Sequence, residues 1–223
     1  MITVHHLNNS RSQRILWLLE ELALPYEIRR YTRDPVTQLA PAELRAVHPL
    51  GKSPVITDGG NTLAESGAVI EYLLDRYGNG RLIPASGTPE RLAFTYWLHF
   101  AEGSAMPPLL MKLVFDKIEA APMPFFVKPI ARAIAKNVNS VLITPNLERN
   151  LGFMESTLAE SEWFAGGQFS AADIQMSFPV EASRGRAGLN ETRPRLMRFL
   201  ERIRGRPAYQ RALEKGGPFS LVF

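Results

Sequence analysis

The spacing of apolar positions changes near residue 84. Before that point, short apolar or alternating runs predict β-strands at residues 2–6, 26–31, 55–58 and 62–64. Helical spacing predicts an amphipathic helix over residues 14–22, a short helical piece at 42–46 and a longer helix over 66–77. The inward positions of the two longer helices are Ile15, Leu18, Leu19, Leu22, Val69, Ile70, Leu73 and Leu74. Beyond residue 84 the strand signals stop.

The predicted elements of residues 1–83 follow the order β-α-β and then α-β-β-α. This order is typical of a thioredoxin-like sheet with helices on both faces. A stretch rich in glycine and proline follows at residues 78–89 and marks a domain boundary. Helices are then expected near residues 89–105, 108–119, 124–142, 145–160, 171–183, 193–204 and 207–215. We therefore expect a thioredoxin-like α/β domain (1–83) and an all-α domain (89–223).

The composition is that of an ordinary globular protein, with 45% apolar and 22% charged residues. Cysteine is absent, which excludes disulfides, a protein thiol nucleophile and thiolate metal sites. The histidines lack metal-ligand spacing, so we expect no metal. The N-terminus has no signal-peptide pattern and no run is long enough to span a bilayer, so the expected location is cytoplasmic, with no integral membrane segment.

The net charge of +4 is concentrated near the C-terminus. The segment from Arg184 to Lys215 holds ten basic and three acidic residues, a balance that attracts nucleic acid or an anionic surface. Proteins that track phosphates usually add interleaved aromatics or a binding motif. We therefore expect a solvated arginine face and no nucleic-acid partner.

The segment 48–56 and the Glu65-Ser66-Gly67 run together indicate a site for a peptide-like ligand. The main chain of Val55 at a strand edge would bind the central amides, and Ser66 at a helix N-terminus would bind a terminal carboxylate. Each segment taken alone has a simpler explanation. Segment 48–56 could be part of a hairpin with a turn proline, and Ser66 could be an N-cap serine.

Ser10 lies where the first strand meets the first helix, so a hydroxyl and free backbone N–H groups converge there. Such a place can stabilise an anion. Lowering a thiol pKa by about two units from ~8.5 requires roughly 2.7 kcal/mol, which one hydroxyl and a helix end can supply. The alternative is that Ser10 or Ser12 is only an N-cap.

The runs at residues 10–22, 48–56 and 64–67 together resemble the N-terminal domain of the glutathione transferases. Residues 102–108 and 169–179 are similar to the helical domain of a fungal and bacterial subgroup that includes the yeast membrane-associated glutathione transferase. The resemblance covers essentially the whole chain. It implies a detoxifying transferase of alkyl or aryl groups, with glutathione as co-substrate, that forms a homodimer.

The resemblance also implies roles for individual residues. Pro54 would follow a cis peptide bond, and Val55 would pair with the cysteinyl backbone of glutathione. Glu65 and Ser66 would hold the γ-glutamyl end and Lys52 the glycyl carboxylate.

The first strand carries no tyrosine to donate to the thiolate. Ser10 is therefore the expected catalytic donor, with Asn9 and the N–H groups around Arg11 as lesser candidates. By contrast, the spacing of Ser170 and Asp173 matches a capping box, which predicts a structural role for Asp173.

The electrophile is expected in the cleft between the two domains. Met106, Leu110, Met111 and Phe115 offer an apolar wall, and Tyr96 or His99 adds a polar contact. Three other functions stay open at this point: a non-catalytic module that docks a protein or RNA, a glutathione-dependent peroxidase, and a dehalogenating transferase.

Overall fold

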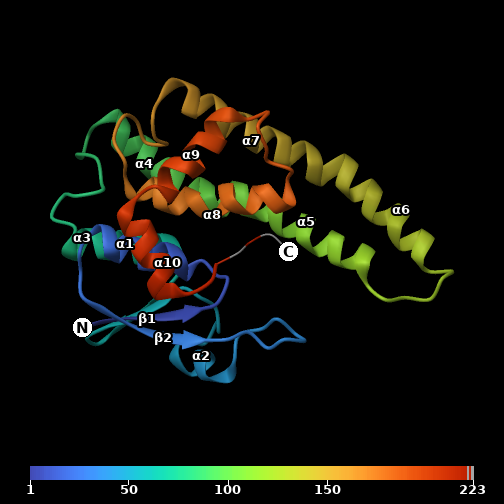
Figure 1. Cartoon of the computed structure of the whole chain (residues 1–223), viewed down its shortest axis with the longest axis horizontal. Helices are drawn as coiled ribbons and strands as arrows, with labels where there is room; N and C mark the ends of the chain where they lie inside the picture. Colours follow the sequence, from blue (N-terminus) through green and yellow to red (C-terminus); the bar gives the residue numbers. More distant parts are fainter. Residues whose placement is uncertain (220, 222–223) are drawn as a thin grey trace.

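The computed structural model describes residues 1–219 and 221, and the first part of the chain forms a four-stranded mixed sheet (Figure 1). Its strands are β1 (Ile2–Leu7), β2 (Tyr26–Tyr31), β3 (Val55–Asp58) and β4 (Asn61–Ala64). They lie in the order β2-β1-β3-β4, with β2 parallel to β1 and the other two pairs antiparallel. This sheet confirms the predicted thioredoxin-like arrangement.

Helices cover both faces of the sheet. The helices α1 (Ser12–Glu21) and α3 (Ser66–Tyr77) pack on one face, where their predicted apolar positions are all buried. The short helix α2 (Ala42–Val47) covers the other face through Leu44, which packs with Leu7 and Tyr31. The two-layer burial follows from side chains that alternate across each strand.

The rest of the described chain is helical. The elements are α4 (Pro89–Phe100), η1 (Ala101–Ala105), α5 (Met106–Ala120), α6 (Lys128–Val138), η2 (Asn139–Ile143), α7 (Thr144–Glu160), α8 (Ala171–Arg186), α9 (Pro194–Arg204) and α10 (Pro207–Gly216). Figure 1 shows α5 and α6 extending away from the body of the molecule, while α10 returns to lie over α1. The helical content confirms the predicted α-helical second part.

The prolines at 107, 108 and 145 do not separate helices as the sequence predicted. The π-helical turn η1 joins α4 directly to α5, and η2 joins α6 directly to α7, so that each set of three elements is one continuous helical segment. A proline ring clashes with the carbonyl four residues earlier, and a wider π turn relieves that clash. Pro108 has no N–H to donate to the carbonyl of Ser104, four residues earlier. Asn150 Nδ2 donates to that carbonyl instead, at 2.8 Å.

The last helix is attached firmly to the first domain. A Cβ on Gly216 would lie 2.5 Å from Gln13 Oε1 and 3.0 Å from Leu16 Cδ1, so any larger residue would require these two side chains of α1 to shift. Arg211 Nε donates to Glu20 at 2.8 Å, and Lys215 Nζ donates to the same carboxylate at 2.5 Å. One apolar core therefore runs through both predicted domains.

The N-terminus of α8 has the capping box that the sequence predicts. Asp173 is fully buried and accepts hydrogen bonds from the backbone N–H groups of Ser170 and Phe164, both at 2.9 Å. Burial raises the pKa of Asp173 to about 6. Its contacts are all within the fold of the second domain, which supports a structural role.

Candidate functional site

Two adjoining cavities lie between the sheet domain and the helical domain. The smaller, of about 310 Å³, is lined by Arg11, Leu50, Lys52, Ser53, Pro54, Ala64, Glu65, Ser66, Glu102 and Leu110. The larger, of about 500 Å³, is lined by Asn9, Ser10, Arg11, Arg33, Gln38, Ser53, Met106, Leu110, Leu113, Lys117, Phe178, Arg186 and Leu221. Arg11, Ser53 and Leu110 line both, so the two cavities form one continuous site.

The smaller cavity brings together three of the predicted binding residues. Lys52 precedes β3, while Glu65 and Ser66 form the start of α3, where free N–H groups favour an anion. Glu65 has a φ of 70°, an unfavourable value for a residue with a Cβ. Strained backbone of this kind gathers at functional sites. The bond between Ser53 and Pro54 is cis, as predicted.

A buried arginine supports the floor of this cavity. Arg14 is 2% exposed, and its Nη2 donates to Ser66 Oγ at 2.9 Å and to Glu102 Oε1 at 2.6 Å. Its Nη1 donates to the carbonyl of Gln175 in α8 at 2.6 Å. Burial lowers the pKa of Arg14 to about 10, so the guanidinium stays charged at neutral pH. Sequence reasoning gave Arg14 no role, although its charge within an apolar helix was a usable signal.

Glu102 reaches the site from η1 in the helical domain. Its carboxylate accepts from Arg11 Nε at 3.0 Å as well as from Arg14. Burial alone would raise the pKa of Glu102, but Arg14 and Arg11 hold it below the usual value. The carboxylate is therefore ionised at neutral pH and lines the smaller cavity. In the sequence, Glu102 stood out only as part of a motif of the helical domain.

Ser10 lies at the boundary of the larger cavity and takes part in a chain of hydroxyls. Its Oγ accepts from the backbone N–H of Ser12 at 3.2 Å, lies 2.7 Å from Ser12 Oγ, and donates to Ser53 Oγ at 3.3 Å. Ser12 Oγ lies 2.9 Å from Nδ1 of His6. Burial and then Arg30 lower the pKa of His6 to about 4, so this imidazole is neutral at pH 7.

Residues 10–76 match the family model described as glutathione S-transferase, N-terminal domain, and residues 116–207 match that of the C-terminal domain. Glutathione S-transferase 3 of Schizosaccharomyces pombe is 38% identical over 215 residues, which cover 96% of this chain and 88% of that protein. The chain belongs to the glutathione S-transferase family.

Two further proteins are similar to this chain, one compared by sequence and one by its solved structure. Glutathione S-transferase 1 of Saccharomyces cerevisiae is 32% identical, with 96% of this chain and 95% of that protein covered. The crystal structure of a glutathione S-transferase from Actinobacillus pleuropneumoniae has 34% identity and a TM-score of 0.78, and covers 99% of this chain and 94% of that one. The two-domain transferase fold is thus shown across nearly the whole chain.

The structure corrects the position predicted for Val55 in this transferase. Val55 is 0% exposed and lies inside the sheet, opposite His5 of β1 and Ala64 of β4. A residue between two strands has no free edge to offer a ligand. Ser53 instead lines both cavities and precedes the strand. Ser53 is therefore the neighbour of Pro54 that reaches both cavities.

The predicted electrophile residues are only partly brought together. Met106 and Leu110 line the larger cavity. Met111 and Phe115 do not line it, although they pack against the apolar cluster that includes Met106. Tyr96 stacks on Phe100 at a ring-centroid distance of 5.8 Å and does not line that cavity. His99 is exposed on α4 and does not line it either. Helical periodicity alone did not distinguish the cavity side of α4 and α5 from their other sides.

The basic segment from Arg184 to Lys215 is largely neutralised by acidic residues from outside the segment. The ion pairs are Arg193–Glu148, Arg202–Glu162, Arg204–Glu181, Arg206–Glu21, Arg211–Glu20 and Lys215–Glu20. The expected arginine face is therefore in large part an intramolecular network that ties α9 and α10 to other helices.

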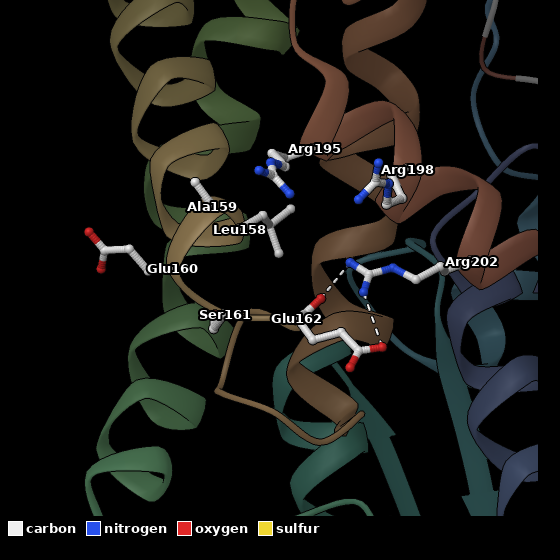
Figure 2. Close-up of a pocket in the computed structure, with 8 residues that line it drawn as sticks. All are labelled: Leu158, Ala159, Glu160, Ser161, Glu162, Arg195, Arg198 and Arg202. Atoms are coloured by element: carbon white, nitrogen blue, oxygen red, sulfur yellow. Dashed lines mark hydrogen bonds and ion pairs between the residues drawn. The ribbon is translucent and has the colours of Figure 1, made fainter.

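A further cavity of about 530 Å³ lies between the end of α7 and α9, away from Ser10. Figure 2 shows Arg195, Arg198 and Arg202 pointing from α9 towards the end of α7, with Arg202 bound to Glu162. Its wall contains none of the residues predicted to bind glutathione.

Residues 1–219 and 221 contain no group of three or more His, Asp or Glu side chains placed to hold a metal ion. In the same residues, no helix combines the length and the apolar character that crossing a bilayer requires.

Proposed function

We propose that this transferase binds glutathione in the smaller cavity and joins it, through its sulfur, to an electrophilic carbon bound in the larger one. Residues 1–83 would supply the tripeptide site and residues 89–223 the acceptor wall. The observation that carries the proposal is the convergence of Lys52, Glu65 and Ser66 in one cavity, beside a second cavity that holds the Ser10 hydroxyl.

Each end of glutathione has a matching group in the smaller cavity. The Lys52 ammonium faces the glycyl carboxylate, for which a point charge suffices. The Ser66 hydroxyl and the N-terminus of α3 receive the γ-glutamyl carboxylate. The carboxylates of Glu65 and Glu102 attract the γ-glutamyl ammonium, and the main chain of Ser53 pairs with the cysteinyl amides.

This placement brings the cysteinyl sulfur towards Ser10, which lines the larger cavity and donates to Ser53, a residue that lines both. The Ser10 hydroxyl turns from Ser53 to the sulfur and donates to the thiolate, while the thiol proton passes to solvent. The thiolate then attacks the acceptor carbon, a C–S bond forms, and the leaving group departs with its bonding electrons. The protein contributes anion stabilisation and proximity, because the nucleophile belongs to glutathione. Asn9 and the N–H groups near Arg11 are the alternative donors.

We extend the proposal to a cytoplasmic, detoxifying homodimer. Cytoplasmic location fits the glutathione pool of that compartment. A second copy has an apolar surface to cover, since Leu92 is 75% and Tyr96 48% exposed on α4. Sedimentation of the purified protein tests the dimer, and a monomer at micromolar concentration would contradict it.

Calorimetry with glutathione tests the proposed function. The unmodified protein should bind the tripeptide, and Ser66→Ala should weaken binding by roughly 1–3 kcal/mol because a carboxylate loses a donor in a partly buried site. Ser156→Ala, on the exposed side of α7, serves as the matched control. Absence of heat at millimolar glutathione would refute the function and favour a non-catalytic binding module.

A further inference from the structure

The larger cavity is surrounded by cations. Arg11 comes from the start of α1, Arg33 from the segment after β2, Lys117 from α5 and Arg186 from the end of α8. No carboxylate occurs among its lining residues in the described part of the chain. Four segments that are separate in the sequence thus place positive charge around one cavity.

This charge is only partly offset by the protein. Arg11 is paired with Glu102, but Arg33 donates from Nη1 to the neutral carbonyl of Gln38 at 3.0 Å. Across the described residues, no carboxylate lies within ion-pair distance of Arg33 or Lys117. Burial and then the charge of Arg11 lower the pKa of Arg33. The cavity wall therefore holds cations that repel one another, and an anion would relieve that repulsion.

The remaining lining is apolar. Met106, Leu110 and Leu113 form one side, and Phe178 with Leu221 forms another. A volume of about 500 Å³ accepts a molecule of a few rings or their equivalent. An apolar body that carries a negative group matches both the apolar surface and the charged rim.

We propose that the acceptor preferred by this site is an anionic electrophile, with an apolar body and a carboxylate, sulfonate or phosphate remote from the reacting carbon. This inference rests on the proposed function and names the acceptor class for it. The apolar body packs on Met106 and Phe178, and the anion faces Arg33 and Lys117. The reacting carbon is then directed to the sulfur beside Ser10.

Two benzyl chlorides that differ in charge test the preference. The probes are para-chloromethylbenzoate and its methyl ester, each incubated with glutathione with and without the protein. In both reactions the thiolate forms a C–S bond, the C–Cl bond breaks, chloride leaves with the electron pair and the thiol proton goes to solvent. Dividing each kcat/KM by the uncatalysed rate constant removes the intrinsic difference in reactivity. The carboxylate should be favoured about tenfold, as expected for one partly screened charge contact.

Variants locate the preference in the cavity. Arg33→Gln and Lys117→Gln should each lower the carboxylate-to-ester ratio several-fold. The matched control is Lys112→Gln, which removes a cation from the same helix as Lys117 but outside the cavity and should leave the ratio unchanged. Raising the ionic strength should reduce the ratio in the unmodified protein, since screening weakens charge contacts.

Equilibrium binding separates failure of this inference from failure of the proposed function. S-(para-carboxybenzyl)glutathione should bind about tenfold more tightly than its methyl ester, and the preference should fall in Arg33→Gln. Equal affinities and equal rate enhancements would overturn the anionic acceptor while leaving the transferase intact. Loss of binding for glutathione itself would refute the function and the inference together.

Discussion

Arg14 of α1 and Glu102 of η1 form an ion pair at 2.6 Å that joins the two domains beneath the smaller cavity. The same guanidinium holds Ser66 at the start of α3. Three elements that line the cavity are therefore fixed to one buried charge. The pair connects the assembly of the two domains to the shape of the site.

The first prediction concerns this pair. Glu102→Gln should lower the free energy of unfolding by about 2 kcal/mol, because Arg14 stays buried without a counter-charge. The 32% exposure of the Glu102 side chain keeps the loss below that of a fully buried pair. Chemical denaturation measures it. Glu148→Gln, which removes an exposed ion pair, should cost less than about 1 kcal/mol; equal losses would contradict the account.

Lys52→Gln should weaken glutathione binding by about tenfold, since the glycyl carboxylate loses its cation. The control is a change in the ligand. γ-Glutamylcysteine lacks the glycyl residue, so its affinity should be the same for the variant and the unmodified protein. Calorimetry measures the affinity of each ligand for each of the two proteins, and the four values form a thermodynamic cycle. A loss of similar size with both ligands would assign Lys52 to another part of the tripeptide.

Asp173 should make stability depend on pH. Burial raises its folded-state pKa to about 6 from 3.8, so the folded protein binds the proton more tightly than the unfolded chain. The contribution of this carboxyl is therefore complete below about pH 4 and is lost as the pH rises through about 6. The unfolding free energy of the unmodified protein minus that of Asp173→Asn should fall across this range. A difference that is constant between pH 4 and 7 would contradict the assignment.

Local patterns predicted the fold well where a single physical rule decided the outcome. Alternation and turn residues identified β3 and β4, and the apolar face of α1 was correct to the residue. The helix ends predicted at prolines 107, 108 and 145 were wrong, because the rules for helix termination consider only residues that are near in sequence. The helix continues through a π turn, and the side chain of Asn150, which is distant in sequence, donates to the Ser104 carbonyl that Pro108 leaves without a partner.

The candidate site was predictable only in part, for a similar reason. The resemblance to the family pointed to Lys52, Glu65 and Ser66, and the structure places them in one cavity. Val55 lies inside the sheet and lines neither cavity, because sequence does not show on which side of Pro54 strand pairing starts. Glu102 is distant in sequence from Arg14, so its contact with the site depends on how the two domains pack.

The central claim is that the junction of the two cavities stabilises the glutathione thiolate through Ser10. Ultraviolet titration of the thiolate in the complex tests it directly. The pKa of bound glutathione should lie about two units below that of the free thiol, and Ser10→Ala should raise it and slow conjugation by about one to two orders of magnitude, with little change in glutathione affinity. Bound glutathione that titrates like the free thiol in the unmodified protein would contradict the account. A lowered pKa that is the same in Ser10→Ala would instead transfer the role to Asn9 and the N–H groups of the helix end.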